Sequence, residues 1–399
     1  MKIGILTFHR SYNYGAFMQC YALSNRIKHD FPDADVEVID YTALSTLMGY
    51  QKGIDGTNKE IAGCLSARNK AIAEAQDKYL PLSEYKLISD DFEELFRNIK
   101  GKYDVIVVGS DAVWNWNNKG FPNAYFLGGN LGAAKMSYAA SAHLLDYTGM
   151  TVENRLKLKE LLSDFSYIGV REDSAEDMIK YADSTLTAHR NCDPTVLLNL
   201  ETVPVDMTAL KEKLQKRGVD FSKPIIGLMA GEPYGKMIKK HYNNKVQIVA
   251  LYVPNKYADV YLYDLNPLEW SRVFSFFGVT ITHFFHGTML SLRNLTPVIP
   301  VEKTSGYNTA YTTKIKHAMH QMGLDEYYFT WKSRKSLLSR ALRKYGILND
   351  KVFWNGICKK IDTMLENPPT EKIKLALEKE AASYDSFHNS LAKILRENE

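Results

Sequence analysis

The chain has 399 residues, of which 45% are hydrophobic and 24% charged, a composition that favours a folded globular protein over disordered and fibrous classes. Its length predicts two or three domains, and its net charge of +4 does not indicate a nucleic-acid partner. It contains no apolar run long enough for a membrane span or a signal peptide, and its four isolated cysteines suit a reducing compartment. We therefore expect a cytoplasmic protein without disulfides or a metal site.

The first predicted strand and helix enclose a polar turn. The apolar run Ile3–Phe8 gives way to polar residues and resumes as Ala16–Leu23. In open α/β sheets the carboxyl ends of the strands bind ligands, and a helix N-terminus there offers free N–H groups. Asn13, Tyr14 and Gly15 are therefore candidate ligand-binding residues, although an ordinary strand-to-helix turn has the same pattern.

Apolar runs alternate with helical patterns along most of the chain. They predict strands at 2–8, 36–41, 105–108, 135–140 and 167–170, and, after a polar stretch that ends at Pro224, at 225–229, 247–253, 279–285 and 297–301. Such alternation predicts parallel sheets with helices on both faces. The pause predicts two similar α/β domains joined near residue 222, with a cleft between them.

Small and polar residues follow the apolar strand 105–108. The strand leads into Gly109, Ser110 and Asp111. Ser110 or Asp111 would cap a following helix, or Asp111 would accept a hydroxyl proton in the cleft.

Two further strands of the first half end in candidate site residues. Ser141 closes a run of small residues, which would let a ligand approach the backbone. Arg171 follows the strand 167–170 and would hold a carboxylate or phosphate through two hydrogen bonds. The alternative for Arg171 is a salt bridge to Glu172 or Asp173.

A histidine marks a strand end in the second half. His286 lies in the predicted turn between the strand 279–285 and the next helix, and Gly287 and Thr288 would place N–H groups at the start of that helix. Because an imidazole titrates near neutral pH, His286 is a candidate general acid or base. A lone histidine is otherwise more often structural, and we expect His283 to point to the opposite face.

Residues 331–345 carry basic residues and no acidic ones, with leucines at helical spacing. This pattern predicts an amphipathic basic helix that packs on the C-terminal domain or contacts a membrane surface. Signatures of dinucleotide binding, P-loop phosphoryl transfer, zinc proteolysis and serine hydrolysis do not occur in the sequence.

Six blocks, taken in this order, resemble the polysaccharide pyruvyl transferase family. They are Asn13-Tyr14-Gly15-Ala16 with Gln19 and Tyr21-Ala22-Leu23, Val108-Gly109-Ser110-Asp111 with Val113-Trp114-Asn115, Ser137-Tyr138-Ala139-Ala140-Ser141, Val170-Arg171-Glu172-Asp173-Ser174, Asp193-Pro194-Thr195-Val196-Leu197-Leu198, and Phe285-His286-Gly287-Thr288. The resemblance implies a GT-B-like α/β fold of two Rossmann-like domains facing a cleft. Residues 1–222 would form the acceptor side and 223–330 the donor side, with 331–399 as C-terminal helices packed on the domains.

The resemblance also implies a reaction. Family members transfer the enolpyruvyl skeleton of phosphoenolpyruvate to a sugar, commonly as a cyclic ketal on a hexose of a surface polysaccharide. The implied partners are phosphoenolpyruvate and a sugar acceptor, lipid-linked or nucleotide-linked, without a cofactor. His286 is the expected acid/base, Arg171 the anion clamp, and Asp111 and Asn13 the acceptor-side groups.

The chain departs from the family at Phe284, where some members carry an arginine that helps to hold the donor. Lys314, Lys303 or Arg293 would supply the missing charge, or the donor is a different molecule.

Two alternatives stay open. Glu302 follows the strand 297–301, where nucleotide-sugar glycosyltransferases of this fold often place a ribose-binding carboxylate. The chain would then be such a glycosyltransferase. The other alternative is a non-catalytic subunit of a membrane-associated polysaccharide assembly that uses the basic helix.

Overall fold

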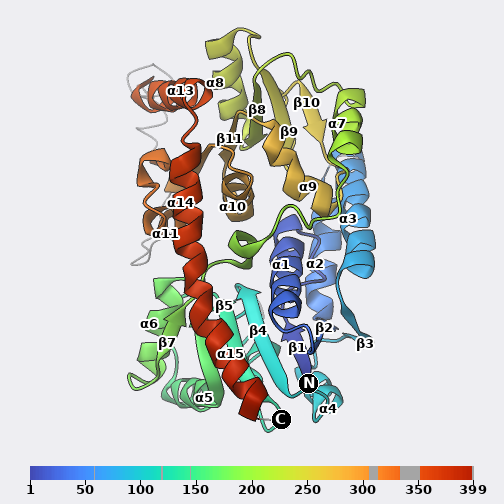
Figure 1. The fold of residues 1–399 in the computed structure, drawn as a ribbon, viewed down its shortest axis with the longest axis vertical. Helices are drawn as coiled ribbons and strands as arrows, with labels where there is room; N and C mark the ends of the chain where they lie inside the picture. Colours follow the sequence, from blue (N-terminus) through green and yellow to red (C-terminus); the bar gives the residue numbers. More distant parts are fainter. Residues whose placement is uncertain (58, 118–119, 144, 305–312, 333–350, 398–399) are drawn as a thin grey trace. The chain divides into compact units, whose positions relative to one another are not determined.

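The computed structural model describes residues 1–57, 59–117, 120–143, 145–304, 313–332 and 351–397 (Figure 1). The chain divides into two compact units. The first comprises Met1–Leu198, Tyr311–Lys314 and Lys379–Glu399, and the second Asn199–Ala310 and Ile315–Glu378.

The first unit is built on a parallel sheet that has seven strands within the described residues, in the order β3-β2-β1-β4-β5-β6-β7. Val105–Val108 of β4 are fully buried, as expected of a central parallel strand covered on both faces. The chain runs outward from β1 on one side and from β4 on the other, so the strand order reverses between these two. The strands are β1 (Lys2–Leu6), β2 (Asp35–Thr42), β3 (Leu82–Ile88), β4 (Val105–Asp111), β5 (Ala134–Ala140), β6 (Phe165–Val170) and β7 (Ala188–Arg190).

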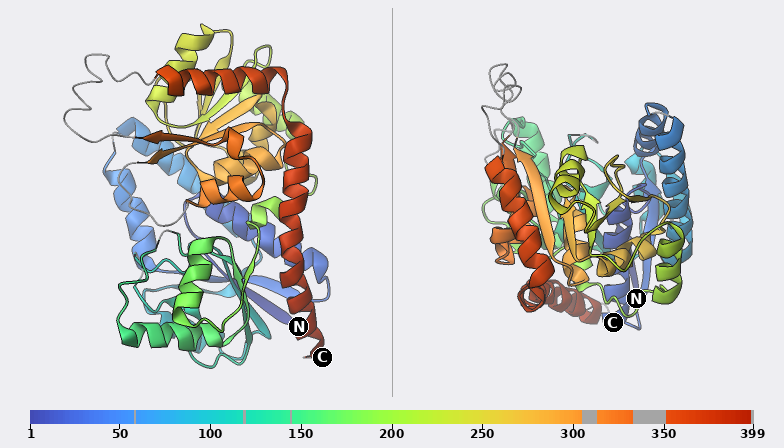
Figure 2. Two further views of the ribbon diagram at one scale, coloured as in Figure 1. Left: turned by 90° about the vertical axis from the view of Figure 1, so that its left-hand side faces the viewer. Right: turned by 90° about the horizontal axis from the view of Figure 1, so that it is seen from above.

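Helices cover both faces of this sheet (Figures 1 and 2). On one face α1 and α15 lie side by side, with Phe31 stacked on His388 at 5.1 Å and the Arg26 guanidinium 4.6 Å from the Tyr384 ring centre. On the other face, side chains of α4, α5 and α6 join one apolar cluster with Trp114. The helices are α1 (Tyr14–Asp30), α2 (Leu44–Asp55), α3 (Lys59–Tyr79), α4 (Phe92–Ile99), α5 (Val152–Ser163), α6 (Asp173–Ala182) and α15 (Asp385–Glu397).

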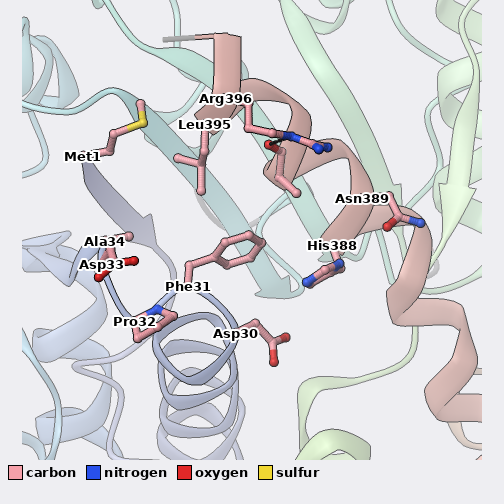
Figure 3. A pocket seen from close by; sticks show the side chains of 11 residues that line it. Met1, Asp30, Phe31, Pro32, Asp33, Ala34, His388, Asn389, Leu395 and Arg396 are labelled. Atoms are coloured by element: carbon pink, nitrogen blue, oxygen red, sulfur yellow. Dashed lines mark hydrogen bonds between the residues drawn. The ribbon is translucent and has the colours of Figure 1, made fainter. Parts of the chain in front are cut away.

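A pocket of about 490 Å³ lies between α15 and the end of α1 (Figure 3). Met1, Asp30–Ala34 and Arg396 contribute to its lining. Because Met1 precedes β1 and Ala34 precedes β2, the pocket lies at the amino edge of the sheet, away from the strand ends that carry the predicted site.

The second unit is built on a parallel sheet in the order β10-β9-β8-β11-β12-β13. Its strand order reverses between β8 and β11. The strands are β8 (Ile225–Met229), β9 (Gln247–Leu251), β10 (Val260–Leu262), β11 (Val279–Thr282), β12 (Val298–Thr304) and β13 (Phe329–Lys332). The helices are α7 (Met207–Lys216), α8 (Glu232–Tyr242), α9 (Pro267–Val273), α10 (Phe285–Arg293), α11 (Lys314–Gln321), α13 (Lys351–Glu366) and α14 (Thr370–Ala381).

The units divide the sequence differently from the predicted boundary at residue 222. The segment that follows Leu198 groups with the second unit, where Lys213 of α7 forms an ion pair with Glu269 of α9 at 2.7 Å. Arg272 also donates to the carbonyl of Leu200 at 2.7 Å. These contacts hold the polar stretch against the unit that follows it. The C-terminal helices are likewise divided, because α13 and most of α14 group with the second unit and α15 with the first.

The predicted basic helix begins inside a strand. Trp331 and Lys332 end β13, which pairs with β12. Residues 333–345, the remainder of that prediction, lie outside the described residues. Among the described helices, none combines the length and apolarity needed to cross a membrane.

Candidate functional site

The reversals of strand order mark one edge of each sheet as a candidate site. In open parallel sheets, ligands bind outside the carboxyl ends of the strands at such a reversal. In the first unit this edge carries Asn13, Asp111, Ser141 and Arg171, each of which follows or ends a strand. In the second unit it carries His286, directly after β11.

Asn13 caps the helix that begins at this edge. Its backbone is extended, and its side-chain oxygen accepts hydrogen bonds from the N–H groups of Gly15 at 2.8 Å and Ala16 at 3.4 Å. Tyr14 and Gly15 are buried in the first turn of α1. The cap explains why the helix begins here, and a role of these three residues toward a ligand stays a prediction.

The loop before Asn13 is braced by a network that the sequence did not reveal. Buried His9 hydrogen-bonds Asp40 of β2 at 2.9 Å, and Arg10 donates to both oxygens of the same carboxylate at 2.8 and 2.5 Å. Although burial opposes it, these hydrogen bonds lower the pKa of Asp40 well below its ordinary range. The carboxylate therefore stays ionised and fixes the path of the loop.

Ser110 joins β4 to α1 and is completely buried. Its N–H and hydroxyl both donate to the side-chain oxygen of Gln19, at 3.1 and 3.0 Å. The amide nitrogen of Gln19 in turn donates to the Thr7 hydroxyl at 3.0 Å. This network locks the reversal between β1 and β4, which leaves the predicted substrate contact of Ser110 a prediction.

Asp111 ends β4 in a left-handed conformation, with φ of 82°. Its carboxylate accepts from the N–H of Ala112 at 2.7 Å. Turns, not a helix, follow it through the described residues 112–117 and 120–123, so the predicted helix cap at Ser110 or Asp111 is wrong. The reason is Trp114, which is fully buried, stacks on Phe126 at 6.0 Å and donates to the Tyr125 carbonyl.

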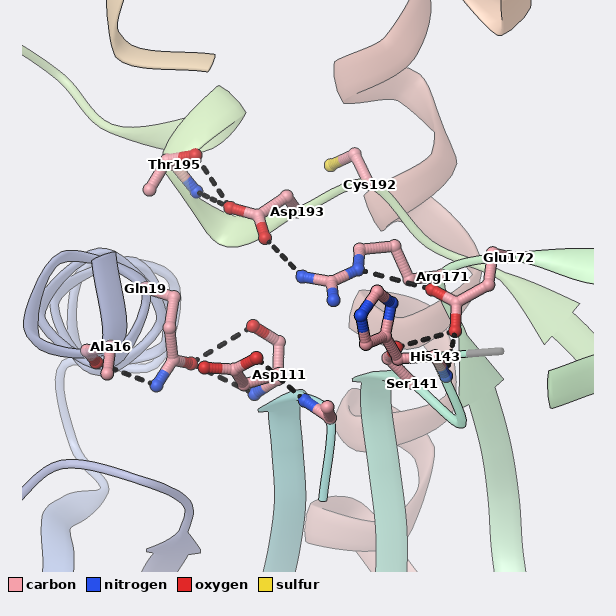
Figure 4. Close-up of polar contacts among 12 residues, drawn as sticks. Ala16, Gln19, Asp111, Ser141, His143, Arg171, Glu172, Cys192, Asp193 and Thr195 are labelled. Atoms are coloured by element: carbon pink, nitrogen blue, oxygen red, sulfur yellow. Dashed lines mark hydrogen bonds and ion pairs between the residues drawn. The ribbon is translucent and has the colours of Figure 1, made fainter. Parts of the chain in front are cut away.

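Arg171 is held between two carboxylates (Figure 4). Its guanidinium donates to Asp193 at 2.7 Å and to Glu172 at 3.4 Å, and all three side chains are buried. The predicted salt bridge to Glu172 is thus present, together with a stronger one to Asp193. The anion clamp predicted for Arg171 stays a prediction.

Glu172 ties the strand ends of β5 and β6 together. One of its oxygens accepts from the Ser141 hydroxyl at 2.5 Å and from the N–H groups of Ala142 and His143 at 3.0 and 3.2 Å. Although burial opposes it, the charge of Arg171 and the Ser141 hydrogen bond lower the pKa of Glu172. The Ser141 hydroxyl therefore serves to position this loop.

Lys314, the first residue of α11, groups with the first unit. Burial lowers the pKa of its ammonium, and the carboxylate of Asp111 opposes that shift. The edge then combines the carboxylates of Asp111, Glu172 and Asp193 with the cations of Arg171 and Lys314, three negative charges against two positive ones.

His286 lies in the first turn of α10, next to the strand end of β11. Gly287 is needed there because a Cβ atom would lie 2.6 Å from the Thr282 hydroxyl oxygen. Thr288 is fully buried and its hydroxyl donates to the carbonyl of Phe284 at 3.1 Å. The geometry thus packs α10 tightly against β11 and brings His286 to the predicted edge.

Phe284, at the position where the resemblance implies an arginine in some members, caps α10 without a side-chain hydrogen bond. Its ring packs edge-on against Tyr252 at 4.9 Å. Among the proposed substitutes, Arg293 is largely buried and its pKa is lowered by burial. Lys303 lies in β12, with its side chain outside the described residues.

His283 and Glu302 lie close to the same edge. The imidazole Nδ1 of His283 hydrogen-bonds the carbonyl of Val301 at 2.6 Å, and burial lowers the pKa of the ring. One oxygen of Glu302 accepts from the Tyr328 hydroxyl at 2.6 Å. His283 is therefore anchored to β12, whereas Glu302 presents a carboxylate held by Tyr328.

Several site residues escaped the sequence interpretation. Glu172 and Asp193 stand inside blocks that were recognised, and their acidic character beside Arg171 was the available signal. His143 follows a recognised block and gave no signal of its own. Within the described part of the chain, no group of three or more His, Cys, Asp or Glu residues is arranged to hold a metal ion.

Solved enzymes share this architecture. UDP-GlcNAc 2-epimerase of Neisseria meningitidis, bound to UDP-GlcNAc, aligns over 98% of this chain and 100% of its own, with a TM-score of 0.56 and 9% identity. A Listeria monocytogenes protein assigned as a UDP-N-acetylglucosamine 2-epimerase aligns over 99% and 97%, with the same TM-score of 0.56 and 9% identity. With the two parallel sheets, these similarities define an α/β two-domain, GT-B-like fold, and that prediction is confirmed.

The sequence itself identifies the family. The family model for polysaccharide pyruvyl transferase matches residues 13–303, a span that begins at the cap of α1 and ends within β12. The chain belongs to this family, as its six sequence blocks implied. Membership supports a transferase that modifies polysaccharides. No curated protein sequence matches the chain significantly.

Proposed function

We propose that the protein transfers the pyruvyl group of phosphoenolpyruvate to a hexose, as a cyclic ketal, during the assembly of a surface polysaccharide. The observation that carries this proposal is the family match over residues 13–303. In the proposed reaction, one sugar hydroxyl adds to C2 of phosphoenolpyruvate while C3 gains a proton. The second hydroxyl then attacks C2 and phosphate leaves, so that one diol and one phosphoenolpyruvate give one ketal and one inorganic phosphate.

The first unit would supply the acceptor side of this reaction. Asp111 presents a carboxylate at the strand reversal, where it would accept the proton of an attacking hydroxyl. At this edge carboxylates outnumber cations. The resulting negative charge favours an uncharged sugar as the ligand over an anionic one. Asn13 and the residues of the α1 turn would orient the sugar.

The second unit would supply the acid–base group. His286 lies at the start of α10, where the N–H groups of the first turn favour an anion such as the phosphate or carboxylate of the donor. In its protonated form the imidazole would deliver the proton to C3, and in its neutral form it would accept one from the second hydroxyl.

Phosphate release tests the proposal. Purified protein with phosphoenolpyruvate and a panel of hexosides, galactosides included, is expected to release inorganic phosphate only when both substrates are present. His286→Ala should lower the rate by at least 100-fold without lowering the melting temperature, since loss of a general acid or base typically costs 10²–10⁴-fold. His320→Ala, an exposed histidine on α11, is the matched control and should retain full activity. A fully active His286→Ala enzyme would remove His286 from the chemistry.

A nucleotide-sugar glycosyltransferase is the second candidate function. It is favoured by Glu302, which lies near the carboxyl end of β12 and whose carboxylate is held by Tyr328. A thermal-shift comparison of phosphoenolpyruvate, UDP and GDP separates the two, because a ligand at 100 times its dissociation constant stabilises the folded state by about 2.7 kcal/mol. Stabilisation by a nucleotide and none by phosphoenolpyruvate would favour the glycosyltransferase.

A further inference from the structure

His143 has no role in the reaction described above, although it lies at the carboxyl edge of the first sheet. Its imidazole is drawn beside the guanidinium of Arg171 (Figure 4), and the charges of Arg171 and Asp111 both act on the ring. The ring Nδ1 is buried and has no hydrogen-bond partner within the described residues. Because a buried polar atom without a partner costs free energy, such an atom at a strand end points to a ligand that completes it.

The backbone of His143 is held firmly in place. Its φ of 40° is left-handed, a conformation that few residues other than glycine adopt and that histidine, asparagine and aspartate adopt more often than the rest. Its N–H donates to Glu172 at 3.2 Å, and its carbonyl accepts from the side-chain amide of Asn115 at 3.0 Å. Residues held in strained conformations by their surroundings cluster at functional sites.

The loops that carry His143 and Asp111 form one hydrogen-bonded platform. The N–H of Ser141 donates to the carbonyl of Asp111 at 2.9 Å, and the N–H of Trp114 donates to the carbonyl of Ser141 at 3.2 Å. Asp111 is itself left-handed, with φ of 82°. Two left-handed residues after adjacent strands, connected by backbone hydrogen bonds, present an imidazole and a carboxylate at a fixed spacing.

The imidazole is neutral in this setting. Burial and the charges of Lys314 and Arg171 lower the pKa of His143 to about 4, against the opposing charges of Glu172 and Asp111. A neutral ring has one donor and one acceptor nitrogen, which suits a hydroxyl group that donates and accepts at once. The two carboxylates and two cations that act on the ring balance one another, which suits an uncharged polyol.

We propose that His143 is a substrate-contacting residue that binds one hydroxyl of the sugar acceptor while Asp111 faces another. The pair would then select a sugar with two hydroxyls at the spacing that the platform sets. This role rests on the proposed function for the identity of the sugar as a substrate, and it assigns His143 to the acceptor, not to phosphoenolpyruvate.

Separate binding measurements test this role. His143→Gly removes the ring and suits the left-handed backbone, so it should fold normally. His143→Asn also tolerates that backbone and retains a polar atom near the position of Nδ1. Saturation-transfer NMR with methyl hexosides measures sugar binding, and calorimetry measures phosphoenolpyruvate binding. His29→Ala, an exposed histidine in the last turn of α1, is the control.

The expected result is hexoside binding about tenfold weaker in His143→Gly, largely recovered in His143→Asn, with phosphoenolpyruvate affinity unchanged in both. The proposal is overturned if His143→Gly binds hexosides like the wild type, if phosphoenolpyruvate binding weakens to the same extent, or if the wild type binds no hexoside at all. Hexoside binding that depends on His143 without phosphate release from phosphoenolpyruvate would reject the proposed function and leave this role standing.

Discussion

Arg171 shows how a buried charge organises the candidate site. Its guanidinium pairs with Asp193 and Glu172, and Glu172 in turn fixes the backbone of the loop after β5. Glu172 is the next residue in the sequence, so its pairing with Arg171 was foreseeable. Asp193 lies 22 residues away, so that pairing was not. The arginine therefore acts first as a structural link between three strand ends.

Removing this link should destabilise the first unit. Arg171→Met leaves two buried carboxylates without their cation, and breaking a buried pair in this way typically costs 3–5 kcal/mol. Arg171→Lys should cost less because it keeps the charge, although one ammonium cannot replace the two-sided contact. Thermal unfolding measures both. Arg97→Met is the matched control, since its ion pair with Asp91 is exposed and should contribute less than about 1 kcal/mol. A wild-type melting temperature in Arg171→Met would mean that the pairs are not structural.

His143 should make stability depend on acidity. Its pKa is about 4 in the folded protein and 6.5 as the ordinary value, so between these pH values the unfolded state binds a proton that the native state does not. The free energy of unfolding should therefore fall as the pH drops from 6.5 to 4. At about 1.4 kcal/mol per pH unit, the whole loss is roughly 3 kcal/mol. The melting temperature of His143→Asn should lack this component. Parallel pH profiles for the two proteins would contradict the assignment.

At the scale of elements, the strands that the sequence did not predict share one property. They are β3, β7, β10 and β13, and each lies at an edge of its sheet. An edge strand is half exposed, so it lacks the continuous apolar run that marks β4 or β8. The central strands were predictable because burial on both faces dictates their composition.

The position of the candidate site at the carboxyl edge was predictable for a similar reason, since polar residues at the ends of apolar strands stand out. The contacts between side chains at this edge could not be predicted from the sequence. Gln19 meets Ser110 across 91 residues, and a contact of that separation exists only once the sheet is assembled. The helix expected after Asp111 failed because Trp114 is drawn into the core, a tertiary effect that local propensity does not contain.

Gly287 is required by the packing of one helix on one strand. A Cβ atom there would lie 2.6 Å from the Thr282 hydroxyl oxygen and 2.9 Å from the Met229 sulfur. Gly287→Ala should therefore destabilise the protein by about 1–3 kcal/mol through overpacking, and should lower activity because α10 carries His286. Gly49→Ala is the matched control, because nothing lies within 4 Å of its added atom and alanine favours α2 by about 0.5–1 kcal/mol. Equal melting temperatures for the two variants would argue against the close packing.

At the scale of the whole molecule, the chain returns to its first unit at its C-terminal end. α15 groups with residues that precede it by some two hundred positions. Tyr167 hydrogen-bonds Ser386 at 2.7 Å, and the side chain of Asn191 donates to the carbonyl of Ser383 at 2.9 Å. A division into consecutive segments of the sequence separates these partners. For this reason the sequence predicted C-terminal helices but not that α15 belongs to the first unit.

Phe387 provides the sharpest test of that arrangement. It is fully buried, with its ring 4.9 Å from Tyr138 and 5.7 Å from Tyr167, both on central strands of the first sheet. Phe387→Ala should cost about 3–5 kcal/mol, because it removes a large buried ring and leaves a cavity against the sheet. Lys393→Ala, on the same helix with an exposed side chain, should change stability by no more than about 0.5 kcal/mol. Hydrogen exchange should show faster exchange in β5 and β6 for the first variant alone, since these strands lose their cover. Unchanged protection of β5 and β6 in Phe387→Ala would show that α15 is an appendage, whereas the predicted loss would make the last helix an integral part of the first unit.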